Sequence, residues 1–200
     1  MECTQLNRDD RGCGCSQRRQ MCVDDPADPG TQGAGAQQEW TIRPITAEEA
    51  RACSGVIRES FLTVAEEFGI TPENAPRFTA FAVTEERLRR EMTEGQQVIA
   101  CFTREGEMAG CYSLRLPDGE AGELNHLCVL PAFRHRHIGA LLMRDALERA
   151  GQHGCRRMTL SLVEENARLK RWYGSFGFVS VRTEKFDFFP FTCGYMERRL

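Results

Sequence analysis

The sequence lacks the features of a membrane, exported or nucleic-acid-binding protein. It has no run of about 18 or more apolar residues, so it predicts no transmembrane helix. The segment Met1 to Gln20 is polar and charged, without the apolar stretch of a secretory signal peptide. Basic residues are not in excess, because 26 Lys and Arg stand against 29 Asp and Glu. We therefore expect a cytoplasmic protein without membrane or nucleic-acid partners.

Two nucleotide-binding motifs and a disulfide framework are also missing. The chain has no Gly-x-x-x-x-Gly-Lys-Ser/Thr sequence, and no Gly-x-Gly-x-x-Gly follows an expected strand. Ten Cys in 200 residues are too few for a disulfide scaffold. Most of them lie in apolar or mixed segments, where a reduced Cys acts as a small hydrophobic side chain. This is consistent with a reducing compartment.

The first 38 residues differ in composition from the rest of the chain. They contain no aromatic residue and are rich in Asp, Arg, Gln and Gly, so they cannot bury enough apolar surface to fold. We expect residues 1–38 to be a disordered tail and linker, and residues 39–200 to form one domain. The tail carries Cys3, Cys13, Cys15 and Cys22, whose spacing is not that of a paired Cys-x-x-Cys zinc site. We predict no metal, and we keep a Cys-tail metal sensor as an alternative.

From residue 40 onward, hydrophobic periodicity and turn residues predict alternating strands and helices. Capping signals at Thr46 with Glu49 and at Thr84 mark two helix starts. The pattern predicts an α/β (α+β) fold with a mixed, mostly antiparallel sheet of six to seven strands and about four helices. The expected strands are 40–45, 97–103, 108–116, 123–130, 158–163, 178–183 and 191–200, and the expected helices are 46–68, 84–95, 138–150 and 167–173.

A basic turn between a strand and a helix is the most informative segment. It reads Pro-Ala-Phe-Arg-His-Arg-His-Ile-Gly over residues 131–139. A helix start presents unpaired N–H groups and the positive end of the helix dipole, which together favour an anion such as phosphate. Arg134 and Arg136 add positive charge, and Gly139 allows close approach of the backbone. The alternative interpretation of this segment alone is a helix start that faces solvent and binds no ligand.

A second segment, Glu-Glu-Asn at 164–166 followed by Arg168 to Phe178, strengthens the anion-site interpretation. Together, the two segments resemble the GNAT superfamily of acetyltransferases. The resemblance covers about residues 40–200, and Ser60 to Gly69 is similar to bacterial members of unassigned substrate. It implies transfer of an acetyl group from acetyl-CoA to a primary amine, by direct attack through a tetrahedral intermediate.

The resemblance also implies which residues hold the coenzyme. They are Leu127, Cys128, Val129, Arg134, His135, Arg136, His137, Ile138, Gly139, Ala140, Asn166 and Tyr173. His137 stands where the family motif has its first loop glycine. Either its N–H still binds phosphate, or its side chain obstructs a loop that requires a positive φ.

The same resemblance assigns Tyr173 as the general acid that protonates the leaving thiolate, although a core aromatic is the alternative. An N–H near residues 127–129 is expected to stabilise the oxyanion. Glu123 is the first candidate for the general base, since it precedes Val129 by six residues on what we expect to be the same strand face as Asn125 and Leu127. Other members of the family have a glutamate at the position of Asn125, which cannot accept a proton. His126 is expected on the opposite face and ranks third, and a route through water alone is a further alternative.

The acceptor amine is not identified by the sequence. Arg77, Phe78 and Phe81 are candidates to line its pocket, or are packing residues. A domain of the same fold that binds CoA or acyl-CoA without turnover is the second functional hypothesis. A homodimer is compatible with both hypotheses.

Overall fold

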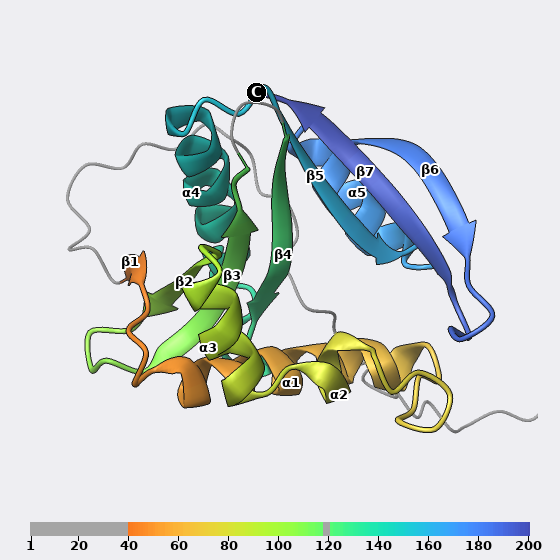
Figure 1. Ribbon diagram of the computed structural model, residues 1–200, viewed down its shortest axis with the longest axis horizontal. Coiled ribbons are helices and arrows are strands. Elements are labelled where there is room, and N and C mark those ends of the chain that lie inside the picture. The colour runs from red at the N-terminus through yellow and green to blue at the C-terminus, as the bar shows by residue number, and fades with distance from the viewer. Residues whose placement is uncertain (1–39, 118–120) are drawn as a thin grey trace, which may run out of the picture.

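The computed structural model describes residues 40–117 and 121–200, and the expected tail with its four Cys lies outside them. A seven-stranded sheet in the order β1-β2-β3-β4-β5-β7-β6 forms the centre (Figure 1). Neighbouring strands are antiparallel except β4 and β5, which are parallel. The mixed sheet predicted from the sequence is thus confirmed. The strands are β1 Thr41–Pro44, β2 Gln97–Phe102, β3 Met108–Arg115, β4 Ala121–Val129, β5 Arg157–Val163, β6 Val179–Lys185 and β7 Thr192–Arg199.

Helices cover both faces of this sheet. The four expected helices are present, and two short elements, α2 and η1, were not predicted because they are too short to show a periodicity. None of the described helices combines the length and apolar content that a membrane span needs. The helical elements are α1 Ala50–Glu67, α2 Thr79–Ala82, α3 Glu85–Thr93, η1 Pro131–Phe133, α4 Ile138–Gln152 and α5 Ala167–Ser175.

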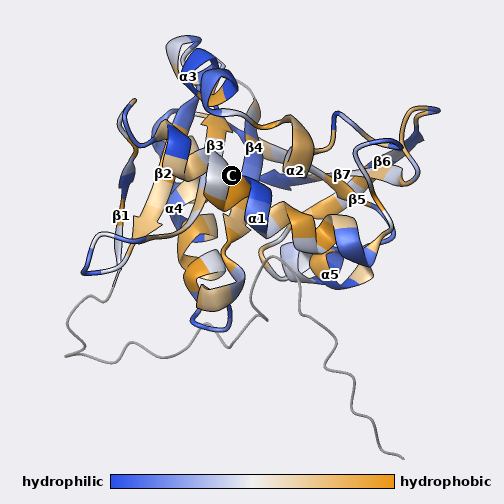
Figure 2. Ribbon diagram, turned by 90° about the horizontal axis from the view of Figure 1, so that it is seen from below, coloured by the Kyte–Doolittle hydropathy of each residue, from blue (hydrophilic) through white to orange (hydrophobic). Residues whose placement is uncertain are grey.

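The two sheet faces bury separate hydrophobic clusters. On one face, α4 and α5 pack against β3, β4 and β5 around side chains such as Leu142 and Trp172. On the other face, α1 and α3 pack against β2 and β3 around side chains such as Ile57 and Leu88. Figure 2 shows that α3 is largely hydrophilic, whereas β2 and β3 inside the molecule are largely hydrophobic. Each helix therefore buries one apolar stripe, as an amphipathic helix does.

The helix starts follow the capping signals with one difference. Thr84 caps α3, since its side chain accepts a hydrogen bond from the Arg87 N–H at 3.2 Å. At α1 only half of the expected capping box forms: Glu49 accepts from the Thr46 N–H at 2.8 Å, but the helix begins at Ala50. Glu49 is held in place by a bidentate ion pair with Arg43, which lowers its pKa to about 2.

A β-bulge at His126 changes which residues of β4 share a face. Cys111 pairs with Cys128, but Ser113 pairs with Asn125, so β4 contains one extra residue between these positions. His126 takes up this residue with a φ of 55°. The bulge reverses the alternation of side chains, as expected for one inserted residue. The expectation that Glu123 and Asn125 share a face with Leu127 and Val129 is therefore wrong.

The parallel strands β4 and β5 separate soon after they begin. They pair only from Ala121 with Arg157 to Glu123 with Thr159. Beyond this point β5 leads away from β4 and continues beside β7, as the divergence of the two strands in Figure 1 shows. The residues of β4 from 124 to 129 therefore have no strand partner on the β5 side among the described residues. The central sheet therefore has a gap between β4 and β5 beyond these pairs.

Candidate active site

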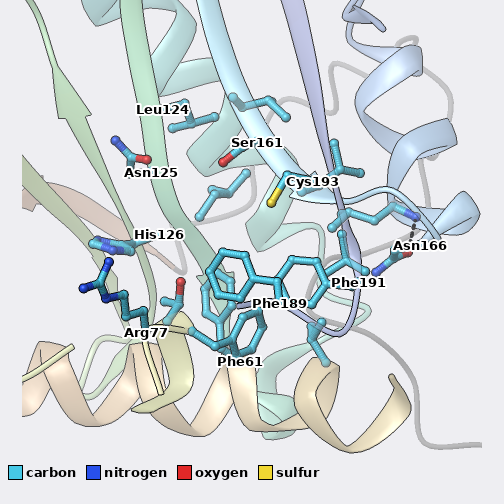
Figure 3. A pocket seen from close by; sticks show the side chains of 18 of the residues that line it. Phe61, Arg77, Leu124, Asn125, His126, Ser161, Asn166, Phe189, Phe191 and Cys193 are labelled. Atoms are coloured by element: carbon cyan, nitrogen blue, oxygen red, sulfur yellow. Dashed lines mark hydrogen bonds between the residues drawn. The ribbon is translucent and has the colours of Figure 1, made fainter. Parts of the chain in front are cut away.

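A cavity of about 260 Å³ lies where β4 and β5 separate. Its walls come from the bulged part of β4, from β5, from α5 and from the segments that carry Phe61, Phe78 and Phe191 (Figure 3). Aromatic and aliphatic side chains form slightly more than half of its lining, and polar residues form most of the rest. The polar lining residues are Arg77, Thr79, Arg87, Asn125, His126, Ser161, Asn166 and Tyr173.

The basic turn lies directly before α4, as expected. His135 and His137 have φ values of 65° and 60°, in the left-handed region that favours glycine. His137 is the N-cap of α4 and its side chain makes no capping hydrogen bond, while Ile138 and Gly139 begin the helix and are buried. The backbone at His137 therefore has the positive φ that was assumed in the hypothesis that its side chain obstructs the loop. A left-handed residue with a Cβ costs about 1–2 kcal/mol.

The two arginines of the turn have different surroundings. Arg134 is buried, and its guanidinium donates to the Val129 carbonyl at 3.2 Å and to Thr63 Oγ1 at 3.1 Å. It therefore ties the turn to the end of β4 and to α1. Arg136 is exposed, with its guanidinium carbon 5.5 Å from the centre of the Phe133 ring. Of the two, Arg136 has the side chain that solvent or a ligand can reach.

Asn166 occupies the start of α5 and lines the cavity. Its Oδ1 accepts a hydrogen bond from the Leu169 N–H at 2.8 Å, so it caps the helix. Its Nδ2 is buried and has no hydrogen-bond partner among the described residues. Leaving such a donor unpaired costs about 1–3 kcal/mol. A ligand acceptor in the cavity would satisfy it.

Tyr173 lies on α5 and also lines the cavity. It is buried, and its ring packs edge-on against Trp172 at 5.2 Å and against Phe178 at 5.9 Å between centroids. Trp172 is not part of the lining and packs against Phe176 in the core. The structure therefore separates the two neighbouring aromatics, with Tyr173 at the cavity and Trp172 behind it.

The end of β4 contributes one side chain to the cavity. Leu127 lines it, whereas Val129 packs in the core on the α4 face. Cys128 points to the α1 face, where its sulfur lies 3.7 Å from that of Cys111. Because this part of β4 has no β5 partner, its backbone edge faces the opening between the strands.

Glu123 lies outside the cavity lining. It pairs across the sheet with Arg115 and Thr159, at the end where β4 and β5 are still together. Its side chain is 47% exposed and its Oε2 is 4.0 Å from Arg115 Nη1. The structure does not bring this carboxylate to the cavity.

His126 is brought into the cavity by the bulge. Its Nδ1 lies 3.1 Å from Ser113 Oγ, which also accepts a hydrogen bond from Gln96 Nε2 at 2.8 Å. Burial lowers the pKa of His126 to about 4; the nearby Arg87 also lowers it, and Glu91 opposes this shift. The imidazole is therefore neutral at neutral pH, and it can accept a proton.

Sequence reasoning ranked His126 third because it assumed unbroken alternation along β4. A signal was present: Leu127 to Leu130 are four apolar residues in a row, which breaks the alternation that precedes them. Of the three residues expected at an acceptor pocket, Arg77 and Phe78 line the cavity and Phe81 does not. Nothing in the sequence singled out Arg87 or Ser161.

Comparison with known proteins identifies the family. Residues 61–178 match the model of the acetyltransferase (GNAT) family. An uncharacterized N-acetyltransferase of Mycobacterium tuberculosis (strain ATCC 25618 / H37Rv) is 26% identical over 117 residues, which cover 58% of this chain and 75% of the relative. An uncharacterized N-acetyltransferase of Mycobacterium bovis matches to the same extent.

Solved structures share the fold. The PaiA N-acetyltransferase of Thermoplasma acidophilum, in complex with coenzyme A, has a TM-score of 0.69 at 20% identity, over 80% of this chain and 99% of the other. A phosphinothricin acetyltransferase of Sinorhizobium meliloti, in complex with acetyl-CoA, has a TM-score of 0.61 at 20% identity, over 82% of this chain and 89% of the other. With a family match over more than half its length, a central sheet that opens between β4 and β5 and a basic turn before α4, this chain belongs to the GNAT family of acetyltransferases.

Proposed function

We propose that this protein transfers the acetyl group of acetyl-CoA to a primary amine. The observation that carries the proposal is the buried Nδ2 of Asn166, an unpaired donor in the cavity between β4 and β5. The start of α4 fits a pyrophosphate, since the positive end of its helix dipole favours an anion. Structural relatives that contain coenzyme A or acetyl-CoA support this assignment.

In this proposal, Asn166, the residues from Arg134 to Ala140 and the edge of β4 hold the coenzyme. The acyl thioester supplies the electrophilic carbonyl. An N–H of β4 near Leu127 to Val129 stabilises the oxyanion, because these residues face the opening without a β5 partner. Arg134 acts indirectly, by fixing the turn against β4 and α1.

We propose His126 as the general base in place of Glu123. A primary amine has a pKa near 10 and must lose a proton before it attacks. The first proton goes to solvent. His126 lines the cavity with its pKa lowered to about 4 by burial, so its imidazole is unprotonated and can take the more acidic proton that the nitrogen loses as it bonds to the acetyl carbon. Glu123 remains outside the lining and is paired with Arg115.

Tyr173 is the proposed general acid for the departing thiolate. Replacing Tyr173 by Phe removes only the hydroxyl, so we expect turnover to fall by about 10²–10⁴-fold. The Kd for coenzyme A should stay within about twofold. Release of free thiol measures the first quantity, and isothermal titration calorimetry measures the second. Tyr195→Phe is the matched control, because Tyr195 lies on β7 outside the lining and its loss should leave turnover unchanged.

The same experiment tests the second hypothesis, a domain that binds CoA without catalysing transfer. This hypothesis is favoured by the left-handed His135 and His137 and by the lack of a carboxylate among the described lining residues. Tight coenzyme binding with no thiol release for any amine would support it. Equal turnover of wild type and Tyr173→Phe would remove Tyr173 from the mechanism.

A further inference from the structure

The charged side chains of the cavity are all basic within the described part of the chain. Arg77 and Arg87 line it, His126 is neutral, and no Asp or Glu belongs to the lining. A buried or half-buried ammonium ion needs an anionic partner to offset its lost hydration. The described lining therefore has no Asp or Glu that could pair with a second ammonium group on an acceptor that carries two.

The two arginines are not equivalent. Arg87 Nε forms an ion pair at 2.7 Å with Glu91, whose side chain is only 14% exposed. Arg77 has no ion pair with any described carboxylate, and its guanidinium carbon lies 5.9 Å from the centre of the Phe188 ring. Arg77 is therefore the unneutralised charge of the lining over residues 40–117 and 121–200.

Aromatic side chains form the wall beside Arg77. Phe61 and Phe78 meet edge-on at 6.1 Å, Phe78 contacts Phe191 at 5.8 Å, and Phe191 stacks on Phe189 at 4.7 Å. They come from α1, from the segment before α2 and from the connection between β6 and β7. All four line the cavity, so they offer an apolar aromatic wall to a ligand.

These groups lie away from the proposed coenzyme residue on α5. In Figure 3, Asn166 is at one end of the cavity and His126 and Arg77 are at the other, with Phe61, Phe189 and Phe191 between them. The end with His126 and Arg77 is thus suited to the acceptor, because it holds the proposed base.

We propose that the acceptor is a small amine that carries both a carboxylate and an apolar side chain, such as a hydrophobic α-amino acid. This inference rests on the proposed acetyl transfer. Arg77 pairs with the carboxylate, the phenylalanine wall packs against the apolar side chain, and the amino group faces His126.

The reaction is balanced with these groups. The ammonium form of the acceptor first loses one proton to solvent, and His126 takes the second proton as the nitrogen bonds to the acetyl carbon. As this nitrogen–carbon bond forms, the carbon–sulfur bond breaks. The nitrogen loses its second proton in this step, and the coenzyme thiolate receives one proton from Tyr173. These two protons cancel in the overall reaction. The products are the N-acetyl amino acid, coenzyme A and one free proton.

Matched acceptors test the role of the carboxylate. With the full chain and saturating acetyl-CoA, thiol release is measured for phenylalanine, for phenethylamine, which lacks only the carboxylate, and for spermidine. We expect kcat/KM for phenylalanine to exceed that for phenethylamine by at least about tenfold, the ratio that 1.4 kcal/mol of differential binding gives. Spermidine should be a poor acceptor.

Variants of Arg77 locate the effect. Arg77→Gln should lower kcat/KM about tenfold for phenylalanine and leave phenethylamine unchanged, while Arg77→Glu should reverse the preference. Arg89→Gln is the control, since Arg89 is exposed, pairs with Glu85 and lies outside the lining. Neither acceptor should respond to it. The Kd for coenzyme A should be the same in all three variants.

The outcomes separate this inference from the proposed function. Comparable use of phenethylamine or spermidine, or equal effects of Arg77→Gln on both aromatic acceptors, would overturn the carboxylate assignment while leaving acetyl transfer intact. Transfer to other amines but not to phenylalanine, leucine or tryptophan would overturn it too. Thermal stabilisation by phenylalanine in wild type but not in Arg77→Gln, with no thiol release for any amine, would instead retain the carboxylate site and reject the transferase.

Discussion

Asn166 combines two roles in one amide group. Its Oδ1 caps α5 through the Leu169 N–H, and its Nδ2 remains an unpaired buried donor in the cavity. Substitutions that keep the cap and remove the donor separate the two roles, because Asp and Ser are both good N-cap residues. Nδ2 has no hydrogen-bond partner among the described residues, so removing it breaks no hydrogen bond between them.

We predict that Asn166→Asp and Asn166→Ser unfold with free energies within about 1 kcal/mol of wild type, since the cap survives. Both should weaken coenzyme A binding by about tenfold, because one hydrogen bond to the ligand is lost. Asp should be the weaker binder of the two if phosphate or carbonyl oxygens approach this position. Urea denaturation and calorimetric titration measure the two effects. Unchanged affinity in both variants would place the coenzyme elsewhere.

His126 should make stability depend on pH in a definite direction. Its folded-state pKa is about 4, below the ordinary value of 6.5, because burial disfavours the charged ring. Above pH 6.5 the ring is neutral in both states and contributes nothing to the dependence. As the pH falls from 6.5 to 4 the unfolded chain binds the proton first, so the free energy of unfolding falls, by at most about 1.4 kcal/mol per pH unit for one group.

The prediction is measured as a difference between wild type and His126→Asn, which cancels the other titrating groups. The difference in unfolding free energy should be flat above pH 7 and should change between pH 6.5 and 4. The same shift predicts that kcat/KM shows no histidine titration between pH 6 and 7. A break in activity near pH 6.5 that His126→Asn abolishes would contradict the lowered pKa.

At the scale of elements, the bulge in β4 determines what the cavity contains. It places His126 in the left-handed region and turns it toward the cavity together with Asn125. Glycine adopts this backbone conformation without strain, whereas a β-branched residue does so at a high cost. Two substitutions at one position can therefore separate the bulge from the imidazole.

We predict that His126→Gly keeps the bulge, with unfolding free energy within about 1 kcal/mol of wild type, and that it keeps coenzyme affinity but loses turnover. His126→Val should be less stable than His126→Gly by at least about 1–2 kcal/mol, because valine carries the left-handed strain that glycine avoids. Chemical denaturation and thiol release provide the measurements. Equal stability of the two variants would mean that the bulge does not depend on this residue, and full activity of His126→Gly would exclude the imidazole as base.

The sequence predicted elements whose signal is local. The spacing of Leu142, Met143 and Ala146 marks α4, and Thr84 marks the start of α3, because both patterns lie within a few turns of helix. The bulge at His126 was not predicted. The four apolar residues from Leu127 to Leu130 break the alternation, but the position of the inserted residue is visible only against the partner strand β3. The ranking of Glu123 above His126 rested on the assumption of unbroken alternation along β4, because a shift of one residue exchanges the two faces.

At the scale of the whole molecule, the cavity depends on segments that are distant in sequence. Phe61, His126, Asn166 and Phe191 come from four different parts of the chain and meet only after the sheet has formed. The family resemblance predicted the basic turn and Asn166, because these positions belong to local motifs. It did not predict the role of Arg77 as an unpaired charge, since that depends on which carboxylates the fold leaves near it.

The buried members of the two clusters on the sheet faces, and those of a third cluster around Phe78 and Phe191, all lie between Ile45 and Met196. Most of the strands around them lie in the same range. We therefore propose that residues 39–200 fold without the preceding segment. A chain that begins at residue 39 should match the full chain in unfolding free energy within about 0.5 kcal/mol, the range of changes that touch no core contact. Its Kd for coenzyme A and its turnover should also be the same.

The comparison also tests the cysteines before residue 39. Cys3, Cys13, Cys15 and Cys22 are removed by the truncation, so elemental analysis of both proteins measures any zinc they hold. We expect no stoichiometric zinc in either, because the spacing of these cysteines is not that of a paired zinc site. One zinc per full chain, lost together with activity on truncation, would instead make the segment a metal-responsive regulator of the transferase. Loss of stability without zinc would show that the domain boundary lies further toward the N-terminus.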